Sequence, residues 1–255
     1  MWALPALDFF RTPQQADGRQ PRHARHAVFA TVNLVMSASF AGLSAELYHR
    51  RLGSLHNVCG PGPAACAWQL FSGVARSLAV QSVLEYYWHV AMHLPYLYAK
   101  LHRHHHTYKS PQVFDDLMIH PLEAFGYYVL LFSPSLVVSQ HYAGMLIYMS
   151  LCGLFGVLDH SGIALRLGPF YDTRAHDVHH RCGFGPAVYK NLAFPFTVMD
   201  VLHHTFVEPR DVGYDEQAPW PSQLLNRTGK MPGSDDGRSR RSGKAPSHSI
   251  GDMTS

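Results

Sequence analysis

Hydrophobic residues along this chain are gathered into four long segments separated by short polar stretches. The segments are 27–47, a run that begins near Ala64 after the turn CGPGP, 122–138 and 142–158. An apolar helix of about 20 residues is long enough to cross a hydrocarbon layer of roughly 30 Å. The pattern therefore predicts about four transmembrane helices in two hairpins, the second of which is 122–158.

The remaining residues are polar, and they divide the chain into regions. Past Pro209 the sequence is rich in Pro, Gly, Ser and charge, which is typical of disorder. The N-terminus contains no run that resembles a signal-peptide core, so we expect the first apolar segment to remain as an anchor. The predicted regions are a cytosolic N-terminal tail (1–26), two transmembrane helices (27–83), a catalytic region (84–210) and a disordered tail (211–255).

The distribution of basic residues indicates how the helices cross the membrane. Lys and Arg number 18 in the N-terminal tail, the 95–121 loop and the region after residue 158, against 2 in the 48–62 loop. The positive-inside rule then places the first three on the cytosolic side. This topology brings to one membrane face His89, His102, His160 and His176. A net charge of +3 is too small to indicate nucleic acid, and we expect no such partner.

The cysteines give little indication of a structural site. The chain has four: Cys59, Cys66, Cys152 and Cys182. They form no C-x-x-C pair, so the spacing predicts neither a disulfide framework nor a cysteine zinc site. A reducing or membrane-buried environment is favoured.

Histidine is unusually frequent, with 19 residues, and many are clustered. The clusters are His89-x-x-x-His93, His102-x-x-His105-His106 and His176-x-x-His179-His180. On a helix, positions i, i+3 and i+4 share one face, so each cluster can direct its imidazoles at a common point. Isolated histidines, in contrast, are expected to pack or to cap helices; these are His49, His56, His120 and His141.

Eight clustered imidazoles are enough to supply four ligands to each of two divalent metals. His160, at the end of the fourth apolar segment, is expected to be a ninth ligand. Structural zinc takes four ligands in total, and the Glu-x-x-His pattern of ferritin-type sites is absent. Nitrogen-rich ligation instead suits a pair of irons that react with dioxygen.

Acidic residues beside the clusters are candidates to orient the ligands. A metal-bound imidazole usually donates its second nitrogen proton to a carboxylate or a carbonyl group. Glu85, Asp159 and Asp177 are placed for this role, although each also fits a solvated or capping acid.

Four stretches of the sequence resemble the fatty acid hydroxylase and sterol desaturase superfamily: EYYWHVAMHLPYLYAKLHRHHHTYKSP, HPLE, LDHSG and HDVHH. The resemblance covers about Leu84 to Thr205 and is closest in detail to the C-4 methylsterol oxidases. It implies a di-iron centre at the cytosolic face of the endoplasmic reticulum membrane. The implied ligands are His89, His93, His102, His105, His106, His160, His176, His179 and His180.

The same resemblance implies a reaction and its partners. Methylsterol oxidases use dioxygen and electrons from NAD(P)H, delivered through cytochrome b5 and its reductase, to oxidise a sterol methyl group. No G-x-G-x-x-G nucleotide fingerprint is present, so we expect the electrons to come from separate redox partners.

The chain also departs from the superfamily pattern. Some members have a histidine four residues before the one matching His160, and here that position is Gly156. The closing motif has become MDVLHHT, with His203 and His204 expected at the surface or in packing. Asn191 and Asp200 match positions of largely structural role.

We therefore predict an all-α integral membrane bundle whose cytosolic helical cap holds a di-iron site, and a lipid oxidase acting on a sterol. The same site fits a sterol desaturase or a hydroxylase of fatty acyl or sphingolipid chains. A carotenoid ring hydroxylase is disfavoured by the short YLYAKLHRHHH spacer, and an inactive relative by the intact histidine motifs. A histidine-rich metal-binding or transport protein is the alternative of another class.

Overall fold

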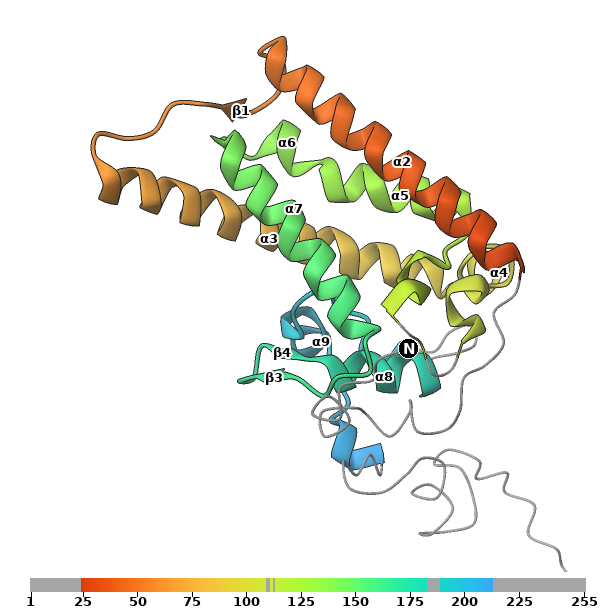
Figure 1. Cartoon of the computed structure of the whole chain (residues 1–255). Coiled ribbons are helices and arrows are strands. Elements are labelled where there is room, and N and C mark those ends of the chain that lie inside the picture. Colours follow the sequence, from red (N-terminus) through yellow and green to blue (C-terminus); the bar gives the residue numbers. More distant parts are fainter. Residues whose placement is uncertain (1–23, 109–110, 112, 183–188, 213–255) are drawn as a thin grey trace, which may run out of the picture.

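The computed structural model describes residues 24–108, 111, 113–182 and 189–212 (Figure 1). Most of the two predicted tails lies outside these residues. At their inner ends, residues 24–26 already belong to the first helix, and residues 211–212 belong to the short 3-10 helix η4 (Pro209–Val212).

Two long helices correspond to the first two apolar segments. Helix α2 spans Ala24–His49 and helix α3 spans Pro63–Met92. Pro63 is at the first position of α3, where its missing N–H has no helical partner to lose. Helix α3 continues past the predicted membrane segment and carries His89 in its last turn.

The predicted second hairpin is present but is interrupted in its first arm. Helix α5 (Pro121–Phe132) is followed by the short helix α6 (Pro134–Val137), and helix α7 (Tyr142–Asp159) forms the second arm. The break falls at Pro134, which lacks the N–H needed to continue α5. By length and composition, α2 and α7 can cross a membrane. The expectation of four transmembrane helices stays a prediction.

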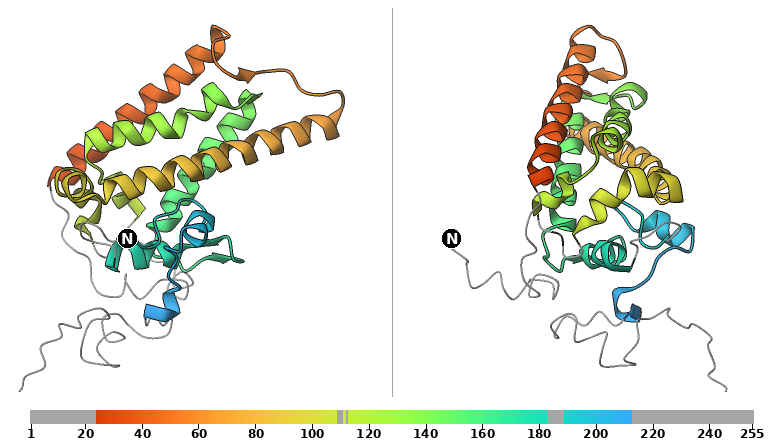
Figure 2. Two further views of the ribbon diagram at one scale, coloured as in Figure 1. Left: turned by 180° about the vertical axis from the view of Figure 1, so that it is seen from behind. Right: turned by 90° about the vertical axis from the view of Figure 1, so that its right-hand side faces the viewer.

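The cap consists of short elements gathered at one end of the long helices, as both views of Figure 2 show. These are α4 (Pro95–Lys100), η2 (His102–Thr107), η3 (Val113–Leu117), α8 (Thr173–Cys182), α9 (Val198–Leu202) and η4. Two small strand pairs were not predicted. Strand β1 (Leu55–His56) pairs in parallel with β2 (Gln140–His141), and β3 (Arg166–Leu167) pairs antiparallel with β4 (Tyr171–Asp172).

The long helices pack on one another but leave apolar residues on their outer surfaces. Tyr148 of α7 is fully buried, and its hydroxyl donates to the carbonyl of Leu131 at 2.9 Å. Large side chains such as Val35, Phe125 and Leu154 are more than half exposed. An exterior of this kind is suited to lipid rather than to water.

A buried amide connects α2 to the segment that precedes α5. Asn33 is fully buried, and its Nδ2 donates to the carbonyl oxygens of Leu117 at 3.1 Å and Ile119 at 2.9 Å. An unpaired amide would be costly in an apolar environment. These bonds therefore fix the position of α2 relative to the cap.

The expectation that no disulfide forms is wrong for one pair. Cys59 and Cys66 are joined by a disulfide in the connection between α2 and α3. Cys66 is near the start of α3 and His89 is in its last turn, which separates them by about 35 Å along a helix rising 1.5 Å per residue. The C-x-x-C criterion missed the pair because the two cysteines are seven positions apart. The turn CGPGP brings them together.

Candidate metal centre

The nine predicted histidines come together as two groups of buried or half-buried side chains. In each group the candidate ligand atoms all lie within 4.8 Å of one another. The first, here the five-histidine cluster, contains His89, His93, His102, His106 and His179. The second, the four-histidine cluster, contains His105, His160, His176 and His180.

Four elements supply these side chains: the C-terminal end of α3, η2, the C-terminal end of α7, and α8. The sequence expectation that each H-x-x-H-H motif aims at a common point needs correction. His105 and His106 are consecutive but belong to different clusters, and the same is true of His179 and His180. The motif in η2 is wound as a 3-10 helix, which turns faster than an α-helix.

Hydrogen bonds determine which nitrogen of several rings is unprotonated. The Nδ1–H of His89 donates to the carbonyl of Leu192 at 2.8 Å, because a carbonyl oxygen can only accept. The Nδ1–H of His102 donates to the Glu123 carboxylate at 2.5 Å. The Nε2 atoms of His89 and His102 then carry lone pairs, yet they face each other at 3.1 Å. Two lone pairs so close repel each other unless a proton or a metal ion lies between them.

The four-histidine cluster has the same arrangement. The Nδ1–H of His160 donates to the Gly156 carbonyl at 2.9 Å, and its Nε2 lies 3.2 Å from Nε2 of His176. The Nε2 atoms of His176 and His180 are 3.0 Å apart. Two nitrogens at right angles around a metal, each about 2.1 Å from it, would be about 3.0 Å apart. The histidines present therefore fit metal ions in both clusters.

Burial keeps the cap histidines in the neutral form that metals bind. Loss of solvation lowers the pKa of His102, His105 and His106 in η2 well below the usual value, and neighbouring imidazoles lower it further. The same causes lower the pKa of His179 and His180. A neutral imidazole is the ligand form, so the site does not have to release protons before it binds metal.

Two of the three acids predicted to orient the ligands have other partners, and the role of Asp177 stays a prediction. Glu85 is hydrogen-bonded to Gln81 at 2.8 Å and not to His89, whose Nδ1 faces a backbone carbonyl. Asp159 accepts from the hydroxyl of Tyr171 at 2.8 Å. Asp177 is buried in α8. The sequence offered their proximity along the chain but not the direction of the side chains.

Glu123 is the orienting acid that the sequence analysis did not assign. It follows the Pro at the start of α5, in the motif HPLE, and is almost fully buried against His102. Its position in a motif shared with the superfamily was the available signal.

Asp116 is a second acid that the sequence analysis did not assign. It lies next to Gly156, the position at which some superfamily members have a histidine. A Cβ added at Gly156 would lie 3.0 Å from Oδ2 of Asp116. The Asp116 carboxylate is also 3.7 Å from Nδ1 of His160. A larger side chain at position 156 would therefore displace this acid from the neighbourhood of the four-histidine cluster.

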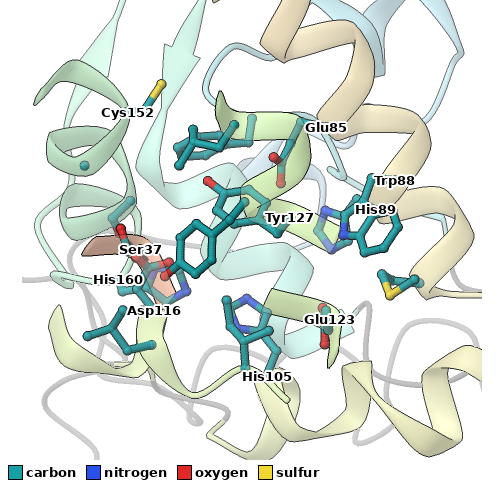
Figure 3. A pocket seen from close by; sticks show the side chains of 18 of the residues that line it. Ser37, Glu85, Trp88, His89, His105, Asp116, Glu123, Tyr127, Cys152 and His160 are labelled. Atoms are coloured by element: carbon teal, nitrogen blue, oxygen red, sulfur yellow. Dashed lines mark hydrogen bonds and ion pairs between the residues drawn. The ribbon is translucent and has the colours of Figure 1, made fainter. Parts of the chain in front are cut away.

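A cavity of about 240 Å³ connects the membrane helices to both clusters (Figure 3). Its wall contains five of the nine histidines, His89, His102, His105, His160 and His176. Its apolar lining comes from the long helices and includes Leu34, Trp88, Leu131 and Met149. A molecule in the cavity would touch apolar side chains and face the ligand histidines at the same time.

Three histidines to which no metal-binding role was assigned, His120, His203 and His204, lie outside both clusters. His120 caps α5 by accepting from the backbone N–H of Leu122 at 3.2 Å, and its ring stacks with His104. His203 is exposed and stacks on Tyr86, and His204 is exposed. These placements agree with capping, packing and surface roles. The side chain of Cys182 lies outside the described part of the structure.

The closing loop of the cap is held by the two predicted structural residues. Asn191 donates to the carbonyls of Ala175 and Val207, both at 3.0 Å. Asp200 accepts from the backbone N–H groups of Leu192 and Ala193 at 2.8 and 2.9 Å. These bonds fix the loop whose Leu192 carbonyl orients His89.

Comparisons with known proteins agree with the motifs. A family model described as fatty acid hydroxylase matches residues 74–205. The protein named "Fatty acid hydroxylase domain-containing protein 2" from Homo sapiens is 30% identical over 102 residues, which cover 40% of this chain and 30% of the relative. Its namesake from Macaca fascicularis is 31% identical over 103 residues, with the same coverage. The chain thus spans about 30% of the length of the curated relatives it matches. No solved structure matches it.

Proposed function

Since the chain belongs to the fatty acid hydroxylase family, we propose that it is a membrane-embedded oxidase that uses two irons and dioxygen to oxidise a lipid. The five-histidine cluster would hold one iron and the four-histidine cluster the other. Imidazole-rich ligation is compatible with several metals, and the family favours iron among them.

The cavity is the observation that carries this proposal. It is lined by apolar side chains of α2, α3, α5 and α7 on one side and by histidines of both clusters on the other. A lipid that enters between the helices would place a carbon–hydrogen bond next to the metal ligands. A metal-storage or transport site would have no need of an apolar cavity at this position.

The chemistry that bound irons supply is the reduction of dioxygen by two electrons and two protons, with one oxygen atom entering a C–H bond and the other leaving as water. The chain's own residues position the ligands. Backbone carbonyls orient three of the rings: Leu192 orients His89, Gly156 orients His160 and Lys190 orients His179. The Glu123 side chain orients His102. The apolar wall excludes water from the reacting carbon.

The substrate proposed first is a 4-methylsterol, on the strength of motif resemblance. Sterol desaturation and the hydroxylation of fatty acyl or sphingolipid chains would use the same site. The electrons would come from NAD(P)H through cytochrome b5 and its reductase, with the active site on the cytosolic side of the endoplasmic reticulum membrane. NADPH alone, without these redox partners, should then give no turnover.

The test combines lipid analysis with metal analysis. Cells lacking the gene, and cells with it restored, are compared for sterols and hydroxylated lipids, and iron is measured in the purified protein. About two irons per chain with accumulated 4-methylsterols in the deletion would support the full proposal. Bound iron together with altered hydroxylated acyl chains would support the oxidase but assign it an acyl lipid as substrate in place of a 4-methylsterol. Absence of iron and unchanged lipids would overturn the enzyme proposal.

A matched pair of variants sharpens this test. His105→Ala should abolish oxidation and lower the metal content while leaving membrane insertion intact. His104→Ala, at the adjacent position, should have little effect because His104 stacks with His120 and meets Phe29 edge-to-face, outside both clusters. Retained activity in His105→Ala would exclude it as a ligand.

A further inference from the structure

Glu85 is a half-buried acid of the cavity wall that no metal-orienting role explains. It lies on α3 one helical turn before His89, and Gln81 donates to its Oε2 at 2.8 Å. Among the described residues, Gln81 is the only hydrogen-bond partner of this carboxylate. A carboxyl group in a cavity wall with one protein partner has acceptor capacity left for a ligand.

A second polar group lies on the same side of the cavity. The hydroxyl of Tyr127 on α5 has no hydrogen-bond partner among the described residues, and Tyr127 lines the cavity together with Glu85. In Figure 3 these two side chains lie on one side of the pocket, and His105 lies on the other. The cavity therefore has a polar position separate from the histidines.

The charge of the wall restricts the headgroup that can bind there. Three carboxylates line the cavity, those of Glu85, Asp116 and Glu123. No Lys or Arg is among the described residues that line it. Away from the histidines, a free fatty acid carboxylate would meet these acidic groups and no Lys or Arg side chain. A neutral hydroxyl group, in contrast, can donate to Glu85 and accept from Tyr127.

We infer that Glu85 and Tyr127 bind the hydroxyl group of a lipid alcohol and so hold a nearby carbon at the metal site. This deepens the proposed function and rests on it. Because Glu85 and His89 are one turn of α3 apart, about 5.4 Å, the oxidised carbon lies only a few bonds from the hydroxyl. Oxidation in the middle or at the far end of a long chain does not fit this spacing.

The volume of the cavity agrees with this arrangement. At about 240 Å³ it is smaller than a pocket that encloses a whole drug-sized molecule, which is about 300 Å³ or more. It therefore holds the hydroxyl-bearing end of the lipid, and the rest extends between the apolar helices.

Binding without turnover tests the inference directly. The purified full-length protein, with its metal and under anaerobic conditions, is titrated with cholesterol, 5α-cholestane, octadecan-1-ol and octadecanoic acid. We expect an alcohol to bind at least about tenfold more tightly than its hydrocarbon or acid counterpart. Preference for cholesterol or for octadecanol distinguishes a sterol from a long-chain substrate.

Variants assign the preference to Glu85. Glu85→Leu should remove the preference for alcohols, and Glu85→Gln, which keeps an acceptor oxygen, should reduce it less. Glu46→Leu makes the same change at an exposed position of α2 and should bind like the unaltered protein. Metal content is measured in each variant and should be unchanged.

Two results would overturn the inference: an undiminished alcohol preference in Glu85→Leu, or loss of metal in that variant, which would show that Glu85 only balances the charge of the ions. Both readouts are independent of turnover. Selective alcohol binding by a protein without iron or oxidase activity would instead overturn the proposed function and leave the binding site standing.

Discussion

His105 and His106 are consecutive residues, yet their rings lie at 82° to each other and belong to different histidine clusters. His179 and His180 in α8 are divided in the same way. Each H-x-x-H-H motif thus contributes to both clusters. Because η2 and α8 are shared in this way, the two clusters cannot be separated into independent modules.

The unequal clusters predict unequal effects of ligand removal. His106→Ala would leave four histidines in its cluster, whereas His105→Ala would leave three. We expect His105→Ala to lose more metal during dialysis against a chelator, measured as metal per chain by mass spectrometry. His104→Ala is the control and should keep its metal. Equal losses in the two ligand variants would contradict the assignment of the clusters.

Acidification should release the metal. The pKa of His102, His176 and His180 is lowered by burial, so these residues take up protons more readily in the unfolded chain than in the folded one. Stability and metal affinity should therefore fall as the pH decreases below about 6.5 and change little above it. Thermal unfolding and metal retention from about pH 8 to about pH 5 measure this. Greater stability at the acidic end would contradict the prediction.

Replacement of the Glu123 carboxyl group should weaken metal binding without removing a ligand. Glu123→Gln replaces the acceptor that fixes the ring of His102, and we expect a loss of about 10- to 100-fold in metal affinity. Chelator competition measures the affinity. Glu46→Gln, on the exposed surface of α2, is the matched control. Unchanged affinity in Glu123→Gln would show that other contacts are sufficient to orient His102.

Gly126 should be intolerant of even a small side chain. A Cβ there would lie 2.2 Å from Cη2 of Trp88, whose indole lines the cavity. Gly126→Ala should displace the indole, alter lipid binding and destabilise the protein by about 1–3 kcal/mol, as overpacking does. Gly42→Ala is the control because nothing lies within 4 Å of its added Cβ. Thermal unfolding and lipid titration of both variants test this, and equal behaviour would count against it.

The disulfide is open to a direct chemical test. Denatured protein treated with a maleimide mass tag should accept two more tags after reduction than before, because Cys59 and Cys66 are paired. Cys59→Ser should abolish this gain completely, because Cys66 is then free and accepts a tag before reduction as well as after it. An unchanged tag number after reduction of the unaltered protein would exclude the bond. Disulfides persist in oxidising compartments, so its presence would support the proposed topology, in which this loop and the histidines lie on opposite sides of the membrane.

Much of the fold could be predicted because it depends on local sequence properties. The length of the apolar segments indicated α2 and α7, and histidine spacing identified the residues that the structure brings together. The break of the third segment at Pro134 was not predicted, although a proline inside a helix is a local signal for one. Two-residue strands such as β1 and β2 depend on contacts between distant segments, which no local pattern encodes.

The finer features of the site could not be predicted for a related reason. Proximity along the chain favoured Glu85 as the partner of His89, but the partner is the carbonyl of Leu192, which is 103 residues away. Backbone carbonyls leave no signature in a sequence. The assignment of each histidine to a cluster also depends on how η2 and α8 face each other, which is a tertiary property.

Asn33 has a consequence for the synthesis of the protein. Its partners, Leu117 and Ile119, lie 84 and 86 residues later in the chain. When α2 first meets the bilayer these carbonyls have not yet been made, so its amide has none of its native partners and is costly to bury in lipid. The native pairing of Asn33 is therefore completed only after the segment before α5 has been translated, which links the final placement of the first helix to assembly of the cap.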